Sequence, residues 1–107
     1  MASVFEELAA LDRLIHEPAR LALLTALASC QQADFLFLQR LTGLSAGNLS
    51  VHLAKLEEAG LVKTEKRIVG KRLNTRVEIT VQGRQAIELH WQKLGELRSA
   101  AANWSQE

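Results

Sequence analysis

The sequence contains few of the residues that build disulfide frameworks, metal clusters or membrane spans. Its 107 residues include one cysteine, one proline and no tyrosine. A single cysteine can neither form a disulfide within the chain nor supply a cysteine metal cluster. No apolar run reaches the roughly 18 residues that a membrane span requires, and the acidic start at residues 1–7 is unlike a secretory signal. We therefore expect a cytoplasmic protein with no metal, no cofactor and no membrane partner.

Signatures of catalysis are also lacking. The sequence has no glycine-rich phosphate loop, no nucleophile elbow and no paired carboxylate–histidine constellation. Its three histidines, His16, His52 and His90, are widely dispersed. A chain of this length can bury one core and leaves little room for a large substrate cleft. We predict a single domain over residues 1–107 that is not an enzyme.

The basic residues gather in one segment of a chain whose formal net charge is only +1. Residues 61–76 contain six of the thirteen lysines and arginines and only one acidic residue. A local basic stripe of this kind is typical of proteins that bind a polyanion. A solvated hairpin whose charges discourage edge pairing would show the same stripe. The charge alone therefore leaves both interpretations open.

Apolar periodicity predicts helices over residues 3–15, 19–30, 35–42, 46–59 and 81–104. The second of these is apolar nearly all round, so we expect it to be the central helix, with Cys30 buried at its end. Asp34 and Ser45 are expected N-caps. Gly43 is expected to end the helix over residues 35–42.

A three-residue turn joins the helices over residues 35–42 and 46–59, which is the helix-turn-helix pattern. Residues 61–69 and 75–80 then predict a two-stranded antiparallel hairpin with a basic tip between them. This order of elements predicts an α+β fold that is mainly α. Its core would be a winged helix-turn-helix, with extra N- and C-terminal helices for dimerisation.

The helix over residues 46–59 has the two faces expected of a recognition helix. Leu49, Leu53 and Leu56 fall on one side and should anchor it in the core. Asparagine can pair with adenine, whereas histidine and lysine can donate to guanine or to phosphates. A merely solvated helix face is the alternative, which the preceding helix and turn disfavour. The predicted DNA contacts are Ser45, Gly47, Asn48, Ser50, Val51, His52 and Lys55.

The hairpin is expected to contact the DNA backbone or the minor groove, chiefly through the basic side chains at its tip. Side chains alternate along a strand, so not all of the basic residues can face one way. The predicted contacts of this wing are Lys66, Arg67, Lys71, Arg72 and Arg76.

The last predicted helix would be about 30 Å long, as wide as a small domain, so it must project past the core or pack on something else. Its apolar residues follow a heptad, which is typical of a helix that pairs with another. We expect the terminal helices to form a homodimer interface. Its predicted residues are Phe5, Leu8, Ile87, His90, Trp91, Leu94, Leu97, Ala101 and Trp104.

Residues 44–62, LSAGNLSVHLAKLEEAGLV, resemble the recognition helix of small winged-helix transcription regulators in the group that includes the ArsR and MarR families. Residues 16–21, HEPARL, are similar to the opening of the second helix in these proteins, and residues 79–86 are similar to the end of their hairpin. The likeness spans residues 11 to about 97. It implies a homodimer that binds double-stranded DNA, with a helix in the major groove and a wing on the flanking backbone.

Two departures from these families qualify the resemblance. The ArsR-group metal sensors use a Cys-x-Cys pair or clustered histidine and acidic ligands, which this sequence lacks. Many MarR-type regulators are longer and have a ligand pocket, so the sequence does not support a small-molecule effector here. We predict a sequence-specific homodimeric repressor that reads a pseudo-palindrome. The alternatives are a winged-helix module that binds another protein and no DNA, and a non-specific nucleoid-type DNA binder.

Overall fold

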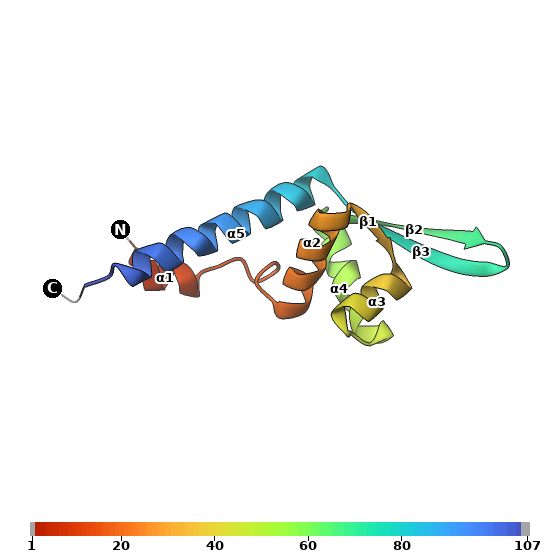
Figure 1. Cartoon of the computed structure of the whole chain (residues 1–107), viewed down its shortest axis with the longest axis horizontal. Helices are drawn as coiled ribbons and strands as arrows, with labels where there is room; N and C mark the ends of the chain where they lie inside the picture. The colour runs from red at the N-terminus through yellow and green to blue at the C-terminus, as the bar shows by residue number, and fades with distance from the viewer. Residues whose placement is uncertain (1, 106–107) are drawn as a thin grey trace.

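The computed structural model describes residues 2–105, which form five helices and a three-stranded antiparallel sheet (Figure 1). This confirms the expected α+β winged-helix fold. The elements in chain order are α1 (Val4–Ala9), α2 (Pro18–Cys30), β1 (Gln32–Asp34), α3 (Phe35–Thr42), α4 (Ala46–Glu58), β2 (Val62–Val69), β3 (Arg72–Ile79) and α5 (Val81–Ala102).

The core lies where α2, α3, α4, the base of the sheet and the start of α5 meet. Leu23, Leu24 and Leu27 make α2 the central helix, with no exposed side-chain surface. Burial of each such leucine stabilises the fold by about 1.5–3 kcal/mol. The leucines predicted to anchor the helix-turn-helix are buried in the same cluster, which confirms that assignment. They are Leu49, Leu53 and Leu56.

The wing, formed by β2 and β3, is longer and tighter than predicted. The strands pair from Val62↔Ile79 to Val69↔Arg72, which leaves a loop of only Gly70 and Lys71. Gly70 has φ +66°, as a two-residue type II′ hairpin requires at its first position. The expected loop over residues 70–74 was therefore wrong. The start of β3 was predicted as loop because polar residues lie next to the turn.

Strand β1 was not predicted. It pairs antiparallel with β3 through Ala33↔Val77 and gives the sheet the order β1-β3-β2. Gln31 reverses the chain after α2 with φ 73°, the only positive φ among the non-glycine residues that the structure describes. A strand of three residues is too short to show the alternation of apolar and polar residues from which strands are predicted. The N-cap role predicted for Asp34 is confirmed, because its side chain accepts a hydrogen bond from the Phe37 N–H.

The predicted helix over residues 3–15 is wrong beyond its first two turns. A capping box between Ser3 and Glu6 starts α1, but the helix ends at Ala9. The Asp12 side chain accepts a hydrogen bond from the Leu14 N–H at 2.9 Å, a local bond that competes with helix formation. Residues 10–17 are instead a linker of turns and bends. Cys30 is also corrected, because it is exposed rather than buried.

The molecule is elongated, with extents of 66 × 25 × 21 Å. Its radius of gyration of 16.6 Å exceeds the ~13 Å of a compact domain of 100 residues. The cause is visible in Figure 1, where α5 projects from one side of the helical core and the wing from the other. Helix α1 packs against the far part of α5, where the rings of Phe5 and Trp104 meet edge-on at 5.3 Å.

A glycine in its first turn lets α5 start close against the core. The Thr80 hydroxyl caps the helix by accepting a hydrogen bond from the Gly83 N–H, and donates to the Gly60 carbonyl at 2.7 Å. A Cβ placed on Gly83 would lie 2.0 Å from the Leu61 carbonyl oxygen. Only glycine fits there, so the point at which α5 leaves the core is fixed by a backbone contact.

Candidate nucleic-acid interface

Helix α4 presents a polar surface opposite its buried leucines. The Ser45 side chain caps the helix by accepting a hydrogen bond from the Asn48 N–H at 3.2 Å. A Cβ on Gly47 would meet no atom within 4 Å, so packing inside the chain does not explain that glycine. The predicted contact residues that lie exposed on or beside α4 are Ser45, Gly47, Asn48, Ser50, Val51 and Lys55.

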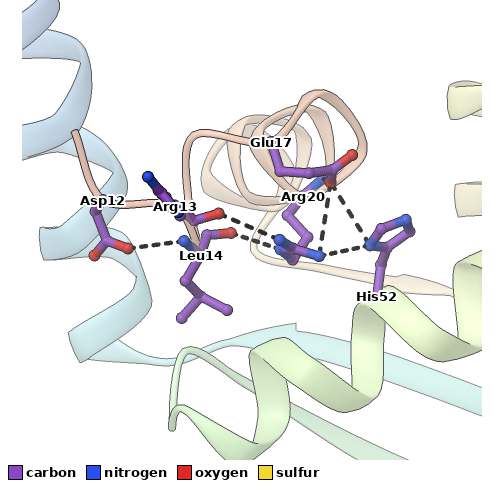
Figure 2. A network of polar contacts seen from close by, with 6 residues as sticks. All are labelled: Asp12, Arg13, Leu14, Glu17, Arg20 and His52. Atoms are coloured by element: carbon purple, nitrogen blue, oxygen red, sulfur yellow. Dashed lines mark hydrogen bonds and ion pairs between the residues drawn. The ribbon is translucent and has the colours of Figure 1, made fainter. Parts of the chain in front are cut away.

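His52, the remaining predicted residue of α4, is held by a neighbouring helix (Figure 2). Its Nδ1 lies 3.0 Å from Nη1 of Arg20, and its side chain is 19% exposed. A guanidinium only donates, so Nδ1 must accept and the ring proton sits on Nε2. His52 therefore carries an oriented N–H donor at the margin of the polar face.

Arg20 connects three parts of the chain and was missed as a site residue. Arg20 is 8% exposed, although it is charged. Nε donates to the Leu14 carbonyl at 2.6 Å and Nη2 to the Arg13 carbonyl at 3.2 Å, both in the linker over residues 10–17 (Figure 2). The sequence offered one signal, a charged residue in the first turn of an otherwise apolar helix. It could not reveal the partners, which depend on the tertiary fold.

Glu17 completes this network as the N-cap of α2. Its Oε2 accepts a hydrogen bond from the Arg20 backbone N–H at 2.9 Å and lies 3.6 Å from Nδ1 of His52. Desolvation is the largest single influence and raises the pKa of Glu17. The backbone hydrogen bonds from Arg20 and Ala19, together with the charge of the Arg20 guanidinium, outweigh it and hold the pKa below its ordinary value. Glu17 is therefore the anionic partner of the buried guanidinium.

The wing places its basic residues on both of its faces. Arg67 lies opposite Asn74, and Arg76 opposite Glu65, so these two arginines share one face. Lys66 is on the other face, which lines a groove against α4. Lys71 lies in the two-residue loop beside Arg72. No single face of the wing therefore holds all three of Lys66, Arg67 and Arg76. The two faces meet at the loop.

Three residues predicted for the dimer interface are buried within their own chain. Ile87 is 1% exposed and belongs to the core, whereas His90 and Leu97 are each 6% exposed. Trp91 is 47% exposed, and its Nε1–H donates to the Thr25 hydroxyl at 2.9 Å. The others lie on α1, on the outer part of α5 or, for Trp104, just beyond its end. Phe5 and Trp104 are exposed, and Leu8, Leu94 and Ala101 are half-buried.

His90 is buried because α5 crosses the linker before α2. Its Nε2 lies 3.0 Å from Nδ1 of His16, so one ring donates and the other accepts. Desolvation, followed by the nearby His16, lowers the pKa of His90, and Asp12 opposes this shift. Within residues 2–105 no cluster of three or more His, Cys, Asp or Glu side chains could hold a metal ion. None of the helices there is long and apolar enough for a membrane span.

Comparison with known proteins agrees with this geometry. The family model of the winged helix DNA-binding domain matches residues 19–97. An uncharacterized protein from Methanocaldococcus jannaschii is 34% identical over 76 residues, which cover 71% of this chain and 83% of that protein. A transcriptional regulator homologue from Pyrococcus horikoshii OT3 is 30% identical, with a TM-score of 0.82 over 92% of this chain and 96% of that chain.

A mutant MarR from E. coli shares the fold at 22% identity, with a TM-score of 0.72 over 96% of this chain and 74% of that chain. The family match covers the helix-turn-helix, the wing and most of α5. The chain belongs to the winged helix DNA-binding domain family and has the fold of the MarR-type transcriptional regulators.

Proposed function

We propose that the protein is a sequence-specific repressor that binds double-stranded DNA as a homodimer. The observation that carries this proposal is the two-sided character of α4. Three of its leucines are buried, and Asn48, Val51 and Lys55 are exposed on the side away from them. A helix of this kind beside a basic wing fits the major groove, which is wide enough to admit an α-helix.

The side chains of α4 supply the chemistry for reading bases. Asn48 offers a paired donor and acceptor for adenine. His52 offers its Nε2–H, since Arg20 occupies Nδ1. Lys55 donates to guanine or to a phosphate. The wing residues Lys71 and Arg72 bind the flanking backbone, which adds affinity without sequence information.

A homodimer is supported by the elongated shape of the chain. The far end of α5, with α1 packed on it, stands clear of the core and leaves Phe5 and Trp104 about half exposed. Large aromatic side chains on a projecting helix are typical of an interface. Two-fold pairing there would present two α4 helices to half-sites about one helical turn apart. A dimer spread over such a site blocks it for other proteins, which is why we propose repression.

The test is selection from a pool of random duplexes by the purified full chain at two salt concentrations. The proposal expects an enriched pseudo-palindrome, and transcription in vitro from a promoter that carries it should fall when the protein is added. Salt-sensitive binding without an enriched sequence would instead indicate a non-specific binder. No binding at low salt would favour the module that binds another protein.

A further inference from the structure

The tip of the wing carries an aliphatic pair that the fold does not use. Ile68 is 75% exposed and Leu73 is 68% exposed, and the two residues are direct partners across the ladder of β2 and β3. They lie far from the core, beyond the part of β3 that pairs with β1. Neither the core nor the sheet contacts of the chain explain why these positions are apolar.

The register places this pair on one face of the wing. Counting along the strands in steps of two, Ile68 shares its face with Val62, and Leu73 shares its face with Val77. Near the base this face is buried against the helices. Further out it lines a groove with α4, to which Ser50 and Lys66 contribute. The aliphatic pair therefore continues the same face as the groove beside the candidate recognition helix.

The surroundings of the pair restrict what can cover it. An exposed apolar pair on a ribbon with free edges favours aggregation and is usually retained for contact with a partner. Here the pair is flanked by cationic side chains on both strands and in the loop, so the partner must combine negative charge with an apolar interior. The flanking cations are Lys66, Arg67, Lys71 and Arg72. The minor groove of DNA offers this combination, with phosphates along its rims and apolar base faces that a side chain reaches by separating a base step.

We propose that Ile68 and Leu73 form an apolar wedge that enters the minor groove beside each half-site and bends the duplex. This inference rests on the proposed function and adds a second mode of contact to it. Two paired strands lie about 4.8 Å apart before their side chains are counted, and the minor groove is about 6 Å wide. The tip therefore fits only if the groove opens, and opening by an apolar wedge bends DNA toward the major groove. Lys71 and Arg72 bind the phosphates on the rims.

The experiment uses the full chain and the duplex enriched in the selection. The variant I68T/L73T places β-branched threonines, which suit a strand, at both positions and leaves every charge in place. The matched control is V81T, because Val81 is also 75% exposed but lies at the start of α5. Circular dichroism checks that each variant is folded. Fluorescence energy transfer between dyes at the duplex ends reports the bend.

We expect wild type and V81T to bind and bend the duplex alike. I68T/L73T should bind about tenfold more weakly and bend it less, with an unchanged salt dependence because the cations remain. Replacing the adenines of the flanks by 2,6-diaminopurine adds an amino group to the minor groove and leaves the major-groove edge intact. It should weaken wild type several-fold and I68T/L73T much less.

Each other outcome has a distinct meaning. If wild type binds the duplex and I68T/L73T binds and bends it equally well, the wedge is overturned and the proposed function stands. If I68T/L73T loses affinity but wild type neither bends the duplex nor responds to diaminopurine, the pair contacts something other than the minor groove, and the wedge is again overturned. If wild type binds no duplex at all, both proposals fail.

Discussion

Nη1 of Arg20 lies 3.0 Å from Nδ1 of His52, so a buried guanidinium in α2 holds a ring on the candidate recognition helix. The same guanidinium donates to the backbone carbonyls of Arg13 and Leu14. The linker over residues 10–17, the start of α2 and the middle of α4 are thus connected through one side chain. The position of α4 depends on this connection as well as on its leucines.

Removal of that side chain should destabilise the protein. Arg20→Met keeps an apolar stem but leaves the partly buried carbonyls of Arg13 and Leu14 and Nδ1 of His52 without their donor. We expect the free energy of unfolding to fall by about 2–4 kcal/mol, since hydrogen bonds to charged groups are each worth about 1.5–3 kcal/mol. Denaturant unfolding measures the change. Arg40→Met, at an exposed position in α3, is the control and should lie within about 0.5 kcal/mol of wild type.

Stability should fall as the pH is lowered through the range where histidine titrates. The pKa of His90 is lowered in the folded protein from its ordinary value of 6.5. Below that value the unfolded chain takes up a proton that the folded chain resists, so the contribution of His90 is present above pH ~6.5 and is lost below it. Unfolding at pH 8 and pH 5.5 should show the loss in wild type. The His90→Gln variant should show a smaller one, and an equal loss in both would contradict the assignment.

Two glycines of α5 should respond to alanine in opposite directions. Gly83→Ala forces a Cβ to 2.0 Å from the Leu61 carbonyl oxygen, so the helix must shift, and we expect destabilisation of about 1–3 kcal/mol. Gly95 has no atom within 4 Å of such a Cβ. Gly95→Ala should stabilise the chain by about 0.5–1 kcal/mol through helix propensity alone. Thermal unfolding of both variants is the measurement. Stabilisation by both would contradict the close contact between Gly83 of α5 and the Leu61 carbonyl.

The proposed dimer should depend on the aromatic pair at the outer end of α5. Phe5 and Trp104 meet edge-on, so the F5A/W104A variant removes one exposed aromatic surface. Loss of a tryptophan at the centre of an interface costs about 2 kcal/mol, which is about a 30-fold weaker dimer. Sedimentation equilibrium measures the dissociation constant. Leu36→Ala, an exposed position on α3, should leave it unchanged. A wild-type chain that sediments as a monomer at all concentrations would refute the dimer.

Positions on α4 and on the wing should affect DNA binding differently. K71A/R72A should weaken binding to all duplexes and reduce the slope of log affinity against log salt by about 0.9 for each phosphate that the variant no longer binds. Asn48→Ala should cost about 1–3 kcal/mol on the enriched sequence and relax the choice of base at one position. Binding titrations at several salt concentrations separate the two effects. Lys93→Ala removes a charge from α5 and serves as the control.

The sequence predicted the helix-turn-helix and the existence of the wing, because both depend on local signals. Ser45, Gly43 and the spacing of Leu49, Leu53 and Leu56 mark the two helices without any knowledge of tertiary contacts. The hairpin was found from its basic, alternating strands. Its turn was misplaced because Leu73 and its polar neighbours resemble a loop.

The features that sequence analysis missed are those that depend on contacts between distant residues. Strand β1 exists because Ala33 reaches Val77 of β3, 44 positions further along the chain. The apolar spacing of Leu11 and Ile15 suggested a longer first helix, yet both side chains are buried from an irregular linker. Arg20 has a local partner in Glu17, but nothing near it in the sequence reveals the bonds to His52 and to the linker carbonyls. In each case tertiary packing overrides the local pattern.

The contact between Gly83 and the Leu61 carbonyl has a consequence for the length of the DNA site. It fixes the point at which α5 leaves the core, and in the proposed dimer the two α5 helices set the distance between the two α4 helices. One extra base pair between half-sites adds about 3.4 Å and about 35° of rotation. An arm fixed by a backbone contact cannot follow both changes, so the spacing of the half-sites would be selected as strictly as their bases.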